Sequence, residues 1–77
     1  LDVWTDYQNV TDDSAEISFK YFGNNDKYSM IVTLDDKNSY KATVDGKAVD
    51  FELRNGSALE FTFDGKIKKG VLKIEIA

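Results

Sequence analysis

The chain has 77 residues and no cysteine, histidine or proline, and its ten basic and fourteen acidic side chains give a formal charge of −4. This length allows one small domain, and the missing residue types remove thiolate nucleophiles, the commonest metal ligand and the commonest general base near neutral pH. The acid excess repels phosphate backbones, and the longest apolar run, three residues, is too short to cross a bilayer. We therefore expect no enzyme activity, no cofactor, no nucleic-acid partner and no contact with a membrane. Because the chain begins at Leu1 rather than at methionine, we expect residues 1–77 to be a single module excised from a larger protein.

Apolar and polar residues alternate along most of the chain, which is the pattern of strands with one buried face. In chain order, the alternation predicts strands over residues 3–8, 15–21, 28–34, 40–44, 49–53, 59–63 and 72–76. No window has the spacing of an amphipathic helix. The sequence therefore predicts an all-β fold, a single antiparallel β-sandwich of about seven short strands, with a small meander β-barrel as the alternative.

Turn residues separate these strands, and their length can be tested because directly opposite residues of a hairpin share a face. A two-residue type I′ turn at Asp45-Gly46 pairs Ala42 with Val49, and Tyr40 with Phe51. The same test predicts three further hairpins: a loop 23–26 pairing Tyr21 with Tyr28, a loop 36–38 with Asn38 left-handed pairing Leu34 with Tyr40, and a bulged loop 54–56 with Gly56 left-handed pairing Phe51 with Leu59. No short loop at Asp64-Gly65 satisfies the test. We therefore expect residues 64–70 to carry the last strand elsewhere, with Ile67 tucked beneath them.

Several stretches resemble known β-sandwich modules. Residues 9–19, NVTDDSAEISF, resemble the first loop and second strand of fibronectin type III and related Ig-like domains. Residues 40–49, 53–61 and 70–76 resemble the small Ig-like accessory modules of bacterial secreted glycoside hydrolases. The resemblance implies an Ig-like sandwich with an accessory role in a larger extracellular or cell-surface protein, whose partners are a neighbouring domain and polysaccharide. The chain departs from the pattern in its short connections and in having no tryptophan in the central strands, which keeps the barrel alternative open.

Trp4 is the strongest candidate for a binding residue. In a regular strand it shares a face with Asp6 and Gln8, and if these polar residues face water then Trp4 does too. An exposed tryptophan beside carboxylate and amide groups can stack on a sugar ring, or it can anchor a partner protein. The remaining interpretation is that Trp4 closes one end of the core while Val3 points outward.

Other residues are candidates for an interface, for metal binding or for catalysis. Ile31, on the outward face of its strand, and Phe22 are candidates for an interface with a neighbouring domain. The pairs Asp12–Asp13 and Asp35–Asp36 lack the spacing of a calcium loop, and Glu52 and Glu60 are solvated strand carboxylates, so we predict neither metal ligands nor catalytic residues. The functional hypotheses are a non-catalytic accessory module acting by interdomain packing or weak glycan binding, a protein–protein interaction module, and a designed β-protein with no natural ligand.

Overall fold

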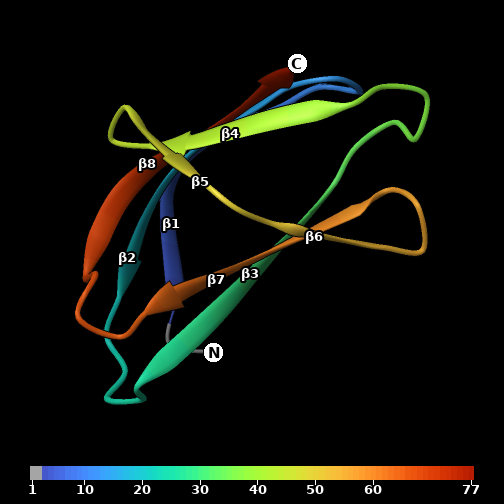
Figure 1. The fold of residues 1–77 in the computed structure, drawn as a ribbon. Coiled ribbons are helices and arrows are strands. Elements are labelled where there is room, and N and C mark those ends of the chain that lie inside the picture. Colours follow the sequence, from blue (N-terminus) through green and yellow to red (C-terminus); the bar gives the residue numbers. More distant parts are fainter. Residues whose placement is uncertain (1–2) are drawn as a thin grey trace.

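The computed structural model describes residues 3–77, and this range folds into two antiparallel β-sheets without a helix (Figure 1). The eight strands are β1 (Val3–Val10), β2 (Ala15–Tyr21), β3 (Lys27–Thr33), β4 (Tyr40–Val44), β5 (Lys47–Val49), β6 (Glu52–Arg54), β7 (Ala58–Asp64) and β8 (Lys69–Ile76). One sheet has five strands in the order β1-β2-β8-β4-β5, and the other has three in the order β3-β7-β6. The predicted all-β fold is confirmed as a small β-sandwich, and the barrel alternative is wrong because the sheets do not close.

The core lies between the two sheets and follows the alternation of the sequence. β2, β3, β7 and β8 send every second side chain inward, and aromatic rings from opposite sheets meet there, with Phe19 of β2 stacked on Phe63 of β7 at 5.4 Å between ring centroids. None of the described residues buries a polar or charged side chain. The buried side chains are Ala15, Ile17, Phe19, Tyr21, Tyr28, Val32, Leu34, Ala42, Val44, Leu59, Phe61, Phe63, Leu72 and Ile74.

The Asp45-Gly46 hairpin is confirmed. Both turn residues have positive φ, 51° and 85°, as a type I′ turn requires, and Ala42 lies opposite Val49. The predicted pairing of Tyr40 with Phe51 is wrong, because β5 ends at Val49 and the chain then crosses to the other sheet. The single strand predicted over residues 49–53 is therefore two short strands, β5 and β6, in different sheets.

The two predicted hairpins around β3 are also wrong, because the chain changes sheets on both sides of this strand. Tyr21 and Tyr28 do not pair within a sheet but face each other across the sandwich, with their stacked rings 3.9 Å apart. Likewise Leu34 does not pair with Tyr40, and Asn38 is absent from the described residues with positive φ. The rule that opposite residues share a face cannot distinguish a pair within one sheet from a pair across the core, because in both cases the two side chains point to the buried side.

The loop before β7 is close to the prediction, shifted by one residue, and the pairing of the strands on either side of it is shifted by two. Leu53, rather than Phe51, lies opposite Leu59, so the loop is 55–57. Gly56 is left-handed as predicted, with φ of 80°, and Asn55 is left-handed too. A shift of two residues leaves every side chain on its predicted face. Phe51 therefore still reaches the core, where its ring lies 5.4 Å from that of Phe61.

The irregular connection after β7 does carry the last strand to the other sheet, where β8 lies between β2 and β4. Ile67 is not tucked beneath it, because its side chain is 38% exposed. Its carbonyl group instead accepts a hydrogen bond from the Tyr28 hydroxyl. This bond joins the connection to the strand that begins the three-stranded sheet.

Tyr21 and Lys68 also contact the loop between β2 and β3. The Tyr21 hydroxyl accepts a hydrogen bond of 2.9 Å from the backbone N–H of Asn25. The Lys68 ammonium lies 4.9 Å from the centroid of the Tyr21 ring and donates to the Gly23 carbonyl at 3.0 Å. Both loops at this end of the sandwich are thus held by the stacked tyrosines.

Gly70 gives a test of core packing. It lies opposite Phe19, and a Cβ placed on it would lie 2.8 Å from Val44 Cγ1 and 3.2 Å from Phe19 Cζ. Gly70→Ala should therefore lower the free energy of unfolding by about 1–3 kcal/mol, because the core must shift to admit the methyl group. Thermal unfolding should show a midpoint lower by roughly 4–8 °C for each kcal/mol. Lys69→Ala, at the exposed neighbouring position, should change stability by less than about 0.5 kcal/mol.

Tyr28 predicts loss of stability at alkaline pH. Burial, and to a smaller degree the neighbouring Tyr21, raises the pKa of the Tyr28 hydroxyl above its usual value of 10.0. The unfolded chain therefore releases this proton first, so the stabilisation is fully present below pH 10.0 and is lost as the pH rises through the folded-state pKa. Urea unfolding at pH 8 to 11 should show a steeper alkaline decline for the wild type than for Tyr28→Phe. The control Tyr7→Phe, at an exposed position, should follow the wild type.

Candidate functional site

The edge strand β1 presents two aromatic side chains on the outer surface of the five-stranded sheet. The register between β1 and β2 shifts at Asp6, which has no opposite residue. On either side of this bulge, Trp4 lies opposite Lys20 and Tyr7 lies opposite Ser18. Lys20 and Ser18 alternate with the core residues of β2 and therefore face outward. Trp4 and Tyr7, which lie opposite them, share this outer face. Their side chains are 63% and 52% exposed.

The bulge has a physical cause in the turn between β1 and β2. This turn places Val10 opposite Ala15, and an unbroken ladder counted back from that pair would set Asp6 opposite the fully buried Phe19. A carboxylate in that position would lie on the inner side of the sheet, away from the Lys20 ammonium with which it pairs in the structure. One extra residue in β1 returns Asp6 to the surface. It also turns Trp4 outward, since the same ladder would have set it against the core.

Two of the predicted binding residues, Trp4 and Asp6, are brought together, and the third is not. Gln8 lies opposite the buried Ile17, so it faces the inner side of the sheet, away from Trp4. The prediction that Gln8 shares a face with Trp4 is wrong because it assumed a regular strand. Tyr7, which the same assumption placed on the Val3 side, takes the place of Gln8 beside Trp4. The exposure of Trp4 also excludes the interpretation in which it closes the core.

Charged and polar groups flank these two rings. The Asp6 carboxylate lies 3.5 Å from the Lys20 ammonium, and both side chains are exposed. Such a pair adds less than about 1 kcal/mol to stability, so both groups are free to bind another molecule. The Ser18 hydroxyl lies opposite Tyr7 on the same face. We call Trp4, Asp6, Tyr7, Ser18 and Lys20 the β1 platform.

The two predicted interface residues lie apart. Ile31 is on the outer face of β3 in the three-stranded sheet and is 59% exposed. Phe22 follows directly after β2 of the five-stranded sheet and is 70% exposed. Because they belong to opposite layers of the sandwich, they do not combine in one patch.

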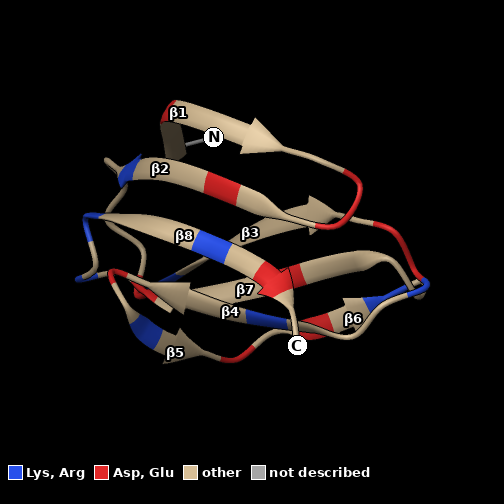
Figure 2. Ribbon diagram, turned by 90° about the horizontal axis from the view of Figure 1, so that it is seen from above, with Lys and Arg blue, Asp and Glu red and all other residues tan. Residues whose placement is uncertain are grey.

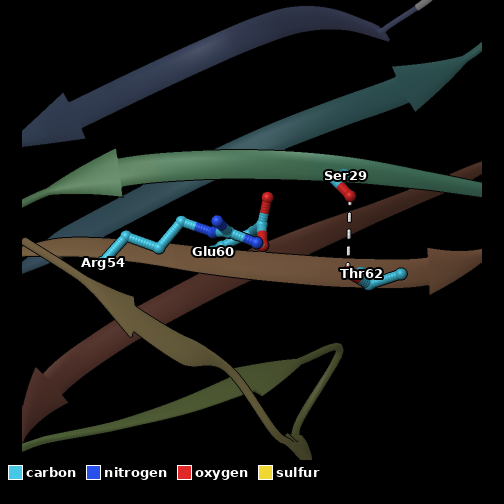
Figure 3. A network of polar contacts seen from close by, with 4 residues as sticks. All are labelled: Ser29, Arg54, Glu60 and Thr62. Atoms are coloured by element: carbon cyan, nitrogen blue, oxygen red, sulfur yellow. Dashed lines mark hydrogen bonds and ion pairs between the residues drawn. The ribbon is translucent and has the colours of Figure 1, made fainter.

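The outer face of β3 and β7, to which Ile31 belongs, has polar side chains that contact one another (Figure 3). Arg54 Nε and Nη2 both lie 2.7 Å from Glu60 Oε1, and Glu60 is directly opposite Ile31. Ser29 Oγ and Thr62 Oγ1 are 3.3 Å apart on the same face. Ile31 is therefore a single apolar side chain within a polar sheet surface.

Metal ligands do not gather within residues 3–77, where no group of three or more Asp, Glu, His or Cys side chains could hold an ion. The turn aspartates bond locally instead: Asp13 Oδ1 accepts from the Thr11 hydroxyl at 3.1 Å, and Asp35 Oδ1 accepts from the Lys37 N–H at 2.9 Å. The same range contains no helix long and apolar enough to cross a membrane.

Comparison of the chain with protein families, curated proteins and solved structures finds no match. Functional assignment therefore depends on the surface of this molecule. Within the described residues, the β1 platform is the place where exposed aromatic rings and hydrogen-bonding groups share one face.

Fluorescence tests the position of Trp4 directly, because it is the only tryptophan. Its indole should be readily quenched by acrylamide in the folded protein, and its emission maximum should move little when urea unfolds the chain. A large red shift on unfolding would show a buried indole and contradict the bulged register. Deleting Asp6 is the informative variant. Without the bulge residue the ladder is continuous and keeps Thr5 opposite Phe19 and Trp4 opposite Lys20, so the emission of the folded variant should stay that of an exposed indole.

Proposed function

We propose that this chain is a non-catalytic accessory module that binds carbohydrate weakly through the β1 platform. The observation that carries the proposal is the pairing of Trp4 and Tyr7 on one exposed face, with Asp6 and Lys20 beside them. Sugar rings combine an apolar face with hydroxyl groups at the rim. An aromatic ring can cover the first while a carboxylate and an ammonium group bind the second.

The spacing of the platform suits an extended chain of sugars better than a single one. Trp4 and Tyr7 are opposite β2 residues two positions apart, a separation of about 7 Å along the strand. Each ring could contact a different residue of a polysaccharide. Since both rings are largely exposed on the outer surface of the sheet, they cover little of any ligand, and we expect dissociation constants on the order of millimolar, or about −4 kcal/mol.

The accessory role places the module in a larger extracellular or cell-surface protein, in which it would bring a neighbouring domain to a polysaccharide. The Ig-like character and the bacterial origin of that protein are part of this proposal. A second candidate function is packing against the neighbouring domain itself. It is favoured by Phe22, whose ring is the most exposed of the large hydrophobic side chains described here.

Affinity electrophoresis through gels containing soluble polysaccharides tests the glycan proposal. The wild-type protein should be retarded by at least one of a panel of β-glucans, xylans and mannans. Trp4→Ala should abolish the retardation and Tyr7→Ala should reduce it by half or more, because each removes one stacking ring.

The matched control is Gln8→Ala on the opposite face of β1, which should migrate as the wild type does in every gel. Equal mobility of all variants, together with flat Trp fluorescence titrations across the panel, would refute glycan binding. Loss of retardation in Gln8→Ala as well would show that β1 as a whole, and not the platform, makes the contact.

A further inference from the structure

The free edge of β3 differs from the other three sheet edges of the described chain. Edge strands invite pairing with other strands, and proteins usually block them with bulges, charges or short strands. β1 has the bulge at Asp6, while β5 and β6 have three residues each. β3 has seven residues without bulge or proline, and only Lys27, at its beginning, is charged. We propose that this edge binds one extended strand of a partner protein, which adds to the three-stranded sheet beneath β1.

The hydrogen bonds that continue the β3–β7 ladder show which backbone groups point to the free edge. Gly65 N–H donates to the Asp26 carbonyl at 2.6 Å, and Leu34 N–H donates to the Ser57 carbonyl at 3.0 Å. Bonded pairs alternate along an antiparallel ladder, so the even-numbered residues of β3 bond to β7. The N–H and C=O groups that face the free edge belong to Lys27, Ser29, Ile31 and Thr33.

β1 extends beyond the free edge of β3, in the opposite layer of the sandwich. β2 covers β3, as the stacked Tyr21 and Tyr28 rings show, and β1 is the next strand outward (Figure 2). No described strand lies beneath β1, and its inward-facing Thr5, Gln8 and Val10 are exposed. Strands of a sheet are about 4.8 Å apart, so one strand added to β3 would lie below β1. Its inward side chains would cover Val10 and the half-buried Met30.

Acidic residues mark one end of this site. The Asp35 N–H, which follows Thr33 on the free edge, donates to the Asp12 carbonyl at 2.7 Å and so joins the β1–β2 turn to the end of β3. Asp12 and Asp13 belong to the β1–β2 turn and Asp35 and Asp36 follow β3, so the two segments joined by this bond are both acidic (Figure 2). An antiparallel strand begins at this end. The partner strand that fits therefore alternates apolar and polar residues and has Lys or Arg at its amino-terminal end.

A second copy of this chain fits the edge less well than a single strand does. If two copies paired through β3, the partner copy's own β2 would cover its β3, as it does here. That β2 would need the position that β1 already occupies. An isolated extended segment has no second layer and avoids this overlap.

The test uses a nine-residue peptide of two lysines followed by alternating valine and threonine, added to isotope-labelled protein. Amide signals of β3 should shift on titration, and the Ser29, Ile31 and Thr33 amides should exchange with solvent at least ten times more slowly in the complex. Methylating the peptide nitrogens that face β3 should abolish binding. Methylating the alternate nitrogens, which face away, should leave it unchanged, and this pair of peptides leaves the protein unaltered.

Protein variants separate edge pairing from side-chain contact. Ile31→Pro removes an N–H from the free edge but none from the β3–β7 ladder, and it should weaken the peptide at least tenfold. Ile31→Thr keeps the backbone donor and should bind within about threefold of the wild type, since backbone bonds carry strand addition. Asp12→Asn with Asp36→Asn should weaken the lysine peptide two- to fivefold, and a peptide with serines in place of lysines should not respond to the change.

Three results would overturn the proposal. The first is the absence of β3 shifts at millimolar peptide. The second is equal binding of the two methylated peptides, which would exclude backbone pairing. The third is slow exchange of the Ser29 and Ile31 amides in the free protein with a dimer in sedimentation, which would assign the edge to a second copy. Failure of glycan binding would leave this proposal untouched, because the β1 platform lies on the other face of β1.

Discussion

The unequal width of the two sheets governs the rest of this molecule, because three strands cannot cover the inner face of five. Adjacent strands lie about 4.8 Å apart, so roughly 10 Å of the larger sheet extends beyond the smaller one. At the β5 end the chain crosses to β6 of the smaller sheet, and Phe51 in this crossing packs against the core. Under β1 there is no described strand, and β1 is left with water on both faces. The aromatic platform above β1 and the open edge of β3 below it are two consequences of this mismatch.

The sequence predicts which side chains are buried better than it predicts which strands are neighbours. Phe19, Phe61 and Leu72 are fully buried where the alternation places them, since burial depends only on the face of a strand. Strand neighbours depend on which sheet each strand joins, and Tyr21 and Tyr28 satisfy the same facing rule across the core that they would satisfy within a ladder. Asp45-Gly46 and Asn55-Gly56 are different, because both residues of each pair adopt positive φ and this fixes a tight turn locally. The two strands that such a turn connects are therefore neighbours whichever sheet they join.

The alternation of polar and apolar residues also predicts part of the candidate site. The exposure of Trp4 follows from the polar character of Asp6, and the structure agrees on both residues. Gln8 and Tyr7 were exchanged because parity assumes a regular strand. The signal for the bulge is nevertheless present in the sequence: the turn that sets Val10 opposite Ala15 would turn Asp6 to the inner side of the sheet, opposite Phe19, if no residue were inserted. A charged residue that falls on the inner side of a register fixed by a nearby turn therefore indicates a bulge.

That one inserted residue affects both surfaces of β1. It turns Trp4 and Tyr7 outward together, and it interrupts the outer edge of β1, so that this edge is a poor template for another strand. The protection does not extend to β3, whose ladder with β7 is regular along its whole length. Strand pairing to other chains is thus disfavoured at the edge that holds the platform and favoured at the edge beneath it. Because the Asp35–Asp12 backbone bond joins the end of β3 to the β1–β2 turn, the spacing between these two surfaces is held by the fold itself.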